Sequence, residues 1–120
     1  MTLESGDMLF FDITPTGMVL QMREGRGNGK DEDGADGDRG GCDTVALRGR
    51  EVARLLWALR QAGMGIAPVN GEELIHEELT VGYTDGMFFL YGDENVCSLE
   101  RHEMYMVLCA MTARVWRMFA

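Results

Sequence analysis

The feature that most constrains this chain is a thirteen-residue segment, residues 47–59, that recurs fifty-two positions later as residues 99–111. Four positions are identical in the two copies: Leu47 and Leu99, Glu51 and Glu103, Leu56 and Leu108, and Ala58 and Ala110. In the first copy the apolar side chains Val52, Leu55, Leu56 and Leu59 follow the i, i+3, i+4, i+7 spacing of one helix face. The sequence therefore predicts two amphipathic helices, from about residue 50 to 61 and from about 100 to 118.

Short apolar runs precede each predicted helix and have the length of strands. They lie at residues 8–13, 18–23 and 44–47 in the first half, and at 79–83, 87–91 and 95–98 in the second. Turn residues separate them, including Pro15 with Gly17 and the pair Asp85-Gly86. We expect an α+β fold in a single domain, residues 1–120, with antiparallel sheets packed against two amphipathic helices. Its duplicated β-β-β-α units would span 8–63 and 72–119. The alternative is that two amphipathic helices share apolar positions by chance.

Two polar segments interrupt this pattern. Residues 25–41 are rich in Gly and Asp and almost without apolar side chains, so they are predicted to form a disordered hairpin loop. Residues 72–78 contain four glutamates and are interpreted as an acidic linker. Together the two regions carry most of the net charge of −9. An acidic balance argues against a protein that binds nucleic acid mainly by neutralising phosphates. The first helix is locally basic.

No catalytic or metal-binding pattern is found. Cys42, Cys97 and Cys109 have no CxxC spacing, which argues against a disulfide framework or a zinc site, and Cys109 is expected to be buried within its helix. Neither a phosphate loop nor a calcium loop is completed, and His76 and His102 lack the spacing of a helical metal site. We expect no enzyme, no metal and no cofactor. Without a long apolar run or a targeting segment, a soluble intracellular protein with no membrane contact is predicted.

Aromatic side chains occupy the predicted strands in both halves of the chain. Phe10 and Phe11 lie in the first unit, and Tyr83, Phe88, Phe89 and Tyr91 in the second. Because neighbouring side chains of a strand point to opposite faces, one member of each Phe pair should face away from the helices. Exposed sheet aromatics are a platform on which unpaired bases stack. The alternative is that these faces meet another sheet or subunit.

Residues 45–56 resemble the unit of the positive-cofactor-four coactivators: a strand ending in Leu is followed by a few polar residues, a Glu and an amphipathic helix. Two such units, the second closed by a long helix over 103–119, resemble the Whirly proteins and the kinetoplastid mitochondrial guide-RNA-binding proteins. The resemblance covers residues 8–119. It implies a sheet platform for single-stranded DNA or RNA and assembly through the helices. This chain has three predicted strands per unit where those families have four, and it is acidic.

The first hypothesis is therefore a non-enzymatic protein that binds single-stranded RNA or DNA on an aromatic sheet platform. Its candidate binding residues are Phe10, Arg23, Arg48, Arg50, Tyr83, Phe88 and Tyr91. The second hypothesis is an acidic protein-interaction or scaffold subunit that keeps the fold, does not bind nucleic acid and docks onto a basic partner. In both, homo- or hetero-oligomers form through the helices. The sequence leaves the compartment, mitochondrial or nuclear, open.

Overall fold

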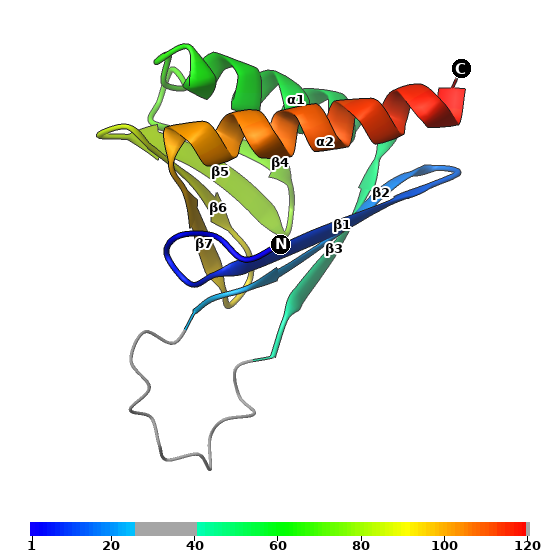
Figure 1. Cartoon of the computed structure of the whole chain (residues 1–120), viewed down its shortest axis with the longest axis horizontal. Helices are drawn as coiled ribbons and strands as arrows, with labels where there is room; N and C mark the ends of the chain where they lie inside the picture. Colours follow the sequence, from blue (N-terminus) through cyan, green and yellow to red (C-terminus); the bar gives the residue numbers. More distant parts are fainter. Residues whose placement is uncertain (26–40, 120) are drawn as a thin grey trace.

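The computed structural model describes residues 1–25 and 41–119, and the side chains up to residue 117. The elements in chain order are β1 (Met8–Thr14), β2 (Gly17–Arg23), β3 (Asp43–Arg48), α1 (Gly49–Gly63), β4 (Glu72–His76), β5 (Leu79–Thr84), β6 (Met87–Tyr91), β7 (Val96–Leu99) and α2 (Arg101–Phe119). They form a three-stranded sheet, β1-β2-β3, a four-stranded sheet, β4-β5-β6-β7, and a layer of two helices (Figure 1). The α+β class predicted from the sequence is confirmed. The predicted disordered loop lies, but for its two end residues, outside the described residues.

β2 is the central strand of the three-stranded sheet and pairs antiparallel with both neighbours. Its side chains Met18, Leu20 and Met22 are buried, whereas Gln21 and Arg23 are exposed. This is the alternation of a strand with one face on the core and the other in solvent. The sheet therefore has one apolar inner face and one polar outer face.

The four-stranded sheet contains two tight hairpins. Asp85 and Gly86 connect β5 to β6 with φ angles of 53° and 81°, the left-handed pair that a two-residue hairpin turn requires. The first strand, β4, corrects the sequence analysis, which took residues 72–78 for an acidic linker. Leu74 and Ile75 interrupt the run of glutamates. The segment is a strand because β4 pairs with β5 and because Ile75 is buried in the core.

The two strand–helix junctions share the local structure that the recurring segment predicts. The backbone N–H of Arg48 donates to Glu51 Oε1 at 2.8 Å, and that of Glu100 donates to Glu103 Oε1 at 2.9 Å. The third residue of each helix is thus a glutamate whose carboxylate accepts a hydrogen bond from the backbone N–H of the residue before the helix. The duplicated β-β-β-α unit itself is not confirmed, because four strands precede α2 and three precede α1.

Each helix lies across both sheets. α1 packs against β2, β3 and β4, while α2 packs against β1, β6 and β7, and the two helices contact each other. A single cluster of buried apolar side chains therefore includes residues of both sheets and both helices. In Figure 1 the helices form one side of the molecule and the two sheets diverge beneath them. No described helix is long and apolar enough to cross a membrane.

Gly17 gives a test of how closely β2 and β3 approach. A Cβ at this position would lie 2.0 Å from the carbonyl oxygen of Leu47, so alanine forces the backbone of β3 to move. We expect Gly17→Ala to lower the free energy of unfolding by about 2 kcal/mol or more, measured by urea denaturation. In the matched control, Gly49→Ala, the Cβ meets no atom within 4 Å. Equal losses in the two variants would contradict the close approach.

Candidate functional site

The structure distributes the predicted aromatic residues over different surfaces. Phe10 lies on the outer face of the three-stranded sheet and is 45% exposed. Phe88 is 1% exposed and belongs to the core, so its ring is not available for stacking on the sheet surface. Its neighbour Phe89 takes the outward position, where its ring stacks on Tyr91 with a centroid distance of 5.9 Å. Tyr83 lies on the inner side, where it lines a small cavity.

The three candidate arginines do not form one cluster with these aromatics. Arg23 lies on the same outer face as Phe10, since its cross-strand partner is Met8 and that of Phe10 is Gln21. Arg48 pairs with Gly17, whereas Phe10 pairs with Gln21. These two positions of β2 are four residues apart, which corresponds to about 13 Å along the strand. Arg50 follows in the first turn of α1. The structure therefore places Phe10 and Arg23 close together, with Arg48 at the far end of the same outer face, and places the other candidates on other surfaces.

The outer face of the four-stranded sheet has aromatic rings without cations. Residues 61–100 contain no lysine or arginine, and the strands and turns of this sheet carry seven acidic side chains: Glu72, Glu73, Glu77, Glu78, Asp85, Asp93 and Glu94. Surfaces that bind single-stranded nucleic acid combine stacking rings with a positively charged track for the phosphates. The stacked pair Phe89 and Tyr91 lacks that second component on its own sheet.

Buried polar groups close the seam between the two sheets. Asp43 Oδ2 accepts hydrogen bonds from the backbone N–H groups of Glu94 and Asn95, at 2.9 and 2.6 Å, and from the Asn95 side-chain amide at 3.2 Å. Asp7 accepts from the backbone N–H of Gly25 at 2.6 Å and from that of Ser98 at 2.9 Å. These carboxylates are occupied by backbone donors, which assigns them a structural role.

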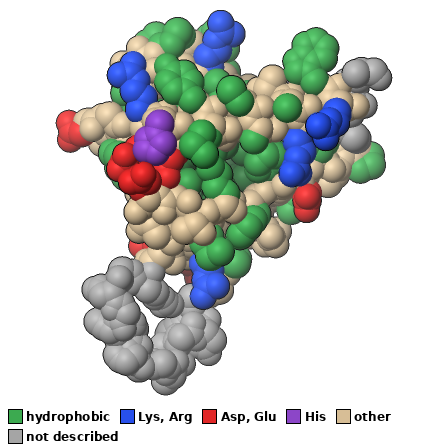
Figure 2. All heavy atoms as spheres, viewed as in Figure 1, with side chains coloured by type: hydrophobic (Ala, Val, Ile, Leu, Met, Phe, Trp, Pro, Cys, Tyr) green, Lys and Arg blue, Asp and Glu red, His purple; other side chains and the backbone are tan. Residues whose placement is uncertain are grey.

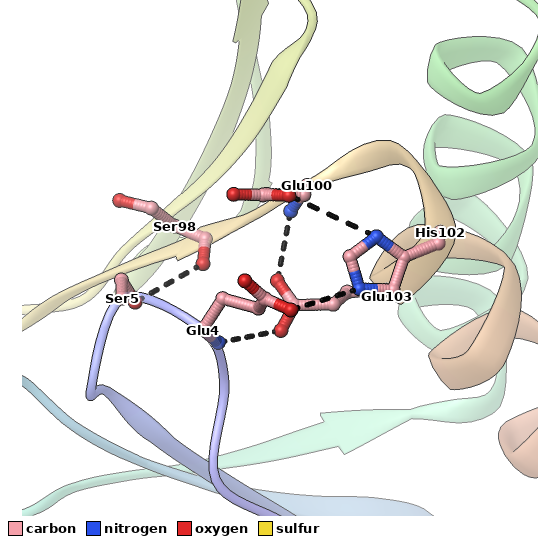
Figure 3. Close-up of polar contacts among 6 residues, drawn as sticks. All are labelled: Glu4, Ser5, Ser98, Glu100, His102 and Glu103. Carbon is pink, nitrogen blue, oxygen red and sulfur yellow. Dashed lines mark hydrogen bonds and ion pairs between the residues drawn. The ribbon is translucent and has the colours of Figure 1, made fainter.

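A second polar cluster ties the N-terminal segment to the start of α2 (Figure 3). Glu103 is buried, and its Oε2 accepts the backbone N–H of Glu4 at 2.6 Å while its Oε1 holds the start of the helix. His102 lies 3.5 Å from Glu4 and 3.8 Å from Glu100. The Ser5 hydroxyl donates to Asp7 Oδ2 at 2.7 Å, with the Ser98 carbonyl oxygen at 3.4 Å as a longer alternative acceptor, and not to the imidazole. Ser5 and His102 therefore do not form a nucleophile–base pair.

The remaining candidate is a groove on the outer side of the helix layer, of about 820 Å³. It is lined by one face of each helix: Ala53, Leu56, Trp57 and Arg60 from α1, with Met64 directly after that helix, and Tyr105, Leu108, Cys109, Thr112 and Ala113 from α2. Both tryptophans of the chain are exposed on the helices, Trp57 by 57% and Trp116 by 68%. Such exposure of large apolar side chains is typical of interaction surfaces. We call this surface the helix groove.

The helix groove also differs from the rest of the molecule in charge. The two helices contain six arginines and two glutamates, whereas the rest of the chain contains eighteen acidic and five basic side chains. Both helical glutamates, Glu51 and Glu103, are engaged at the helix starts. Figure 2 shows hydrophobic side chains along the helices with basic groups between them. The helix layer is thus an apolar and basic surface on an acidic protein.

Association through the helices was predicted from the sequence, but none of these groove residues was, although a signal was present. Besides the core positions, α1 has a second set of apolar positions, Ala53, Leu56 and Trp57, which share a helix face with Arg60 and are continued by Met64 directly after the helix. Cys109 belongs to the corresponding face of α2 and is exposed, so its predicted burial is wrong. A helix with two apolar faces is typical of a helix that packs on its own core with one face and on another partner with the second.

Among the described residues, no group of three or more His, Cys, Asp or Glu is placed to hold a metal ion.

The seam between the sheets can be tested at Asp43. Asp43→Ala leaves the backbone N–H groups of Glu94 and Asn95 without their acceptor. It also removes one of the two acceptors of the side-chain amide of Asn95, a residue that is 7% exposed. We expect the free energy of unfolding to fall by about 2 kcal/mol, measured by urea denaturation. Asp93→Ala, an exposed carboxylate in the same turn, serves as the control and should change it by less than about 0.5 kcal/mol. Similar values for both would show that Asp43 does not hold the seam.

The three cysteines should differ in reactivity. Cys42 and Cys109 are exposed, whereas Cys97 is buried, and burial together with the nearby charge of Asp7 raises the pKa of its thiol to about 12. Because the thiolate is the reactive form, we expect two thiols to react promptly with a disulfide reagent in the folded protein and the third only after denaturation. Raising the pH from 7 to 9 should leave Cys97 unreactive in the folded protein, because its raised pKa lies above that range. Three equally fast thiols would contradict this burial.

Comparisons of the chain with protein-family models, with curated protein sequences and with solved structures find no match. The resemblance of the strand–helix units to the positive-cofactor-four and Whirly proteins therefore stays a prediction.

Proposed function

We propose that this protein is a non-enzymatic interaction subunit that binds a partner protein through the helix groove and the exposed side chains around it. The observation that carries the proposal is the exposure of both tryptophans on the helix layer. Tryptophan, tyrosine, methionine and arginine are the side chains enriched at protein interfaces. Met64, Tyr105 and Met106 add to the same layer, each about half exposed. The second sequence hypothesis, an interaction subunit, is thereby favoured, with the helices in place of an acidic surface as the main contact.

Single-stranded nucleic-acid binding is the second candidate, and one observation favours it. Phe10 and Arg23 lie on one open face of the three-stranded sheet, so a stacking ring and a cation are available together. The acidic character of the four-stranded sheet limits such a platform to the smaller sheet, where a few nucleotides at most would be held. This is why the helix groove is the stronger candidate.

Position-specific cross-linking tests the proposal. A photoreactive phenylalanine analogue is placed at Trp57 or Trp116 in cells that make the protein, and in matched variants at Phe10 or Tyr91 on the two sheets. We expect one protein to be cross-linked from the helix positions and not from the sheet positions. Reconstituted binding to that protein should weaken at least about tenfold in Trp57→Ala, since an interface anchor of this kind contributes 1.4 kcal/mol or more. Phe10→Ala should leave it unchanged.

Two outcomes would count against this function. Cross-links that form equally from sheet and helix positions, or from none, would remove the helix groove as the binding surface. Fluorescence anisotropy with labelled single-stranded DNA and RNA covers the second candidate. Binding that weakens with added salt and is lost in both Phe10→Ala and Arg23→Ala would instead establish the sheet platform.

A further inference from the structure

We infer that the helix groove accepts an amphipathic helix of the partner, with an apolar face and at least one carboxylate directed at Arg60. This inference rests on the proposed function and specifies the chemistry of the partner. It follows from the shape of the groove, from the hydrogen-bonding state of its walls and from the distribution of charge around it.

The two walls of the groove are antiparallel helices. The hydroxyl of Tyr105, near the start of α2, donates to the carbonyl of Gly63 at the end of α1, while Val115, near the end of α2, lines a pocket with Gly49 at the start of α1. The α1 wall runs from Ala53 to Met64, which corresponds to about 16 Å of helix, or three turns. Ridges of side chains on a third helix of this length can pack between the two walls.

A helix fits this groove better than an extended peptide because the walls offer no backbone partners. The lining residues Ala53 to Arg60 and Tyr105 to Ala113 lie within helices, where backbone N–H and C=O groups bond internally. A bound strand would leave its own backbone groups unpaired in an apolar surround. A helix satisfies its backbone internally and presents only side chains.

The charge of the groove selects an acidic helix. Arg60 is the only charged residue among the lining side chains. Among the described residues ion pairs occur at His102 and Arg114, and none at Arg60. A partner that covers the groove removes water from this guanidinium, which is costly unless a carboxylate replaces the lost hydration.

A second copy of this chain is a poor occupant of the groove. In a two-fold symmetric dimer the same surface meets itself. The groove would then cover Arg60 with a surface that offers no carboxylate, because Arg60 is its only charged side chain and both helical glutamates are engaged at the helix starts. Docking of the groove on the acidic sheet of another copy is a head-to-tail contact, which produces open chains rather than a closed dimer. A different protein with an acidic helix avoids both problems.

Two synthetic peptides of about 18 residues test the inference with the full chain. Both carry leucine at i, i+3, i+4 and i+7, and their remaining positions are alanine with either glutamate or lysine. We expect the glutamate peptide to bind at least about tenfold more tightly in fluorescence anisotropy at moderate salt. The net charge of −9 opposes that preference, so only a local basic site can produce it.

Arg60→Glu should abolish or invert the preference. The matched control is Arg54→Glu, which makes the same charge change at an exposed position of the same helix outside the groove; its preference should stay within about twofold of that of the unaltered chain. Circular dichroism checks that both variants fold. Equal binding of the two peptides, no binding of either, or equal effects of the two substitutions would overturn the inference.

The outcomes for the inference and for the proposed function are distinct. If a partner cross-links at Trp57 but the peptides show no acidic preference, the interaction function stands and the acidic helix fails. If the acidic peptide binds through Arg60 but no protein cross-links from the helix positions, the groove chemistry stands and the proposed function fails. Self-association through the helix layer, detected by sedimentation and lost in Arg60→Glu, would assign the groove to a second copy.

Discussion

The structure depends on how two separate sheets are held in one core. Their strands share no ladder of hydrogen bonds. The contact between them lies where the end of β2 meets β7, and Cys97 of β7 also reaches the carbonyl of Met8 at the start of β1. At this seam buried backbone donors need acceptors, because an unpaired N–H away from water is costly. Asp43 and Asp7 supply these acceptors from the three-stranded side. The carboxylates that could have suggested chemistry thus serve to join the sheets.

The helices complete this connection and create the candidate site as a consequence. Each helix rests on both sheets, and the end of α1 is fixed against the start of α2 at one carbonyl. Gly63 O accepts from the Tyr105 hydroxyl at 2.7 Å and from Arg101 at 3.2 and 3.3 Å. These donors satisfy a carbonyl left free at the helix end and place positive charge where the helix dipole favours it. The antiparallel arrangement that results leaves one open groove along the outer side.

Residues with strong local patterns were predicted correctly. The spacing of Val52, Leu55 and Leu59 determines α1, and the pair Asp85-Gly86 determines the β5–β6 turn, because both depend on neighbours within a few residues. β4 was missed because its glutamates are typical of a solvated segment, and only pairing with β5 and burial of Ile75 make it a strand. Cys109 was misplaced because periodicity gives the faces of a helix without telling which of them is covered.

The sequence by itself determined the α+β class, both helices, most of the strands and the acidic character of the chain, since these follow from local spacing and composition. The tertiary structure alone decided which aromatic side chains face solvent. Phe88 and Phe89 are the same residue type and neighbours in the chain. The register of β6 against β5 and β7 buries Phe88 and turns Phe89 outward. It also decided that Trp57 and Trp116 lie uncovered, because burial depends on which elements pack against a helix, and that information is not local.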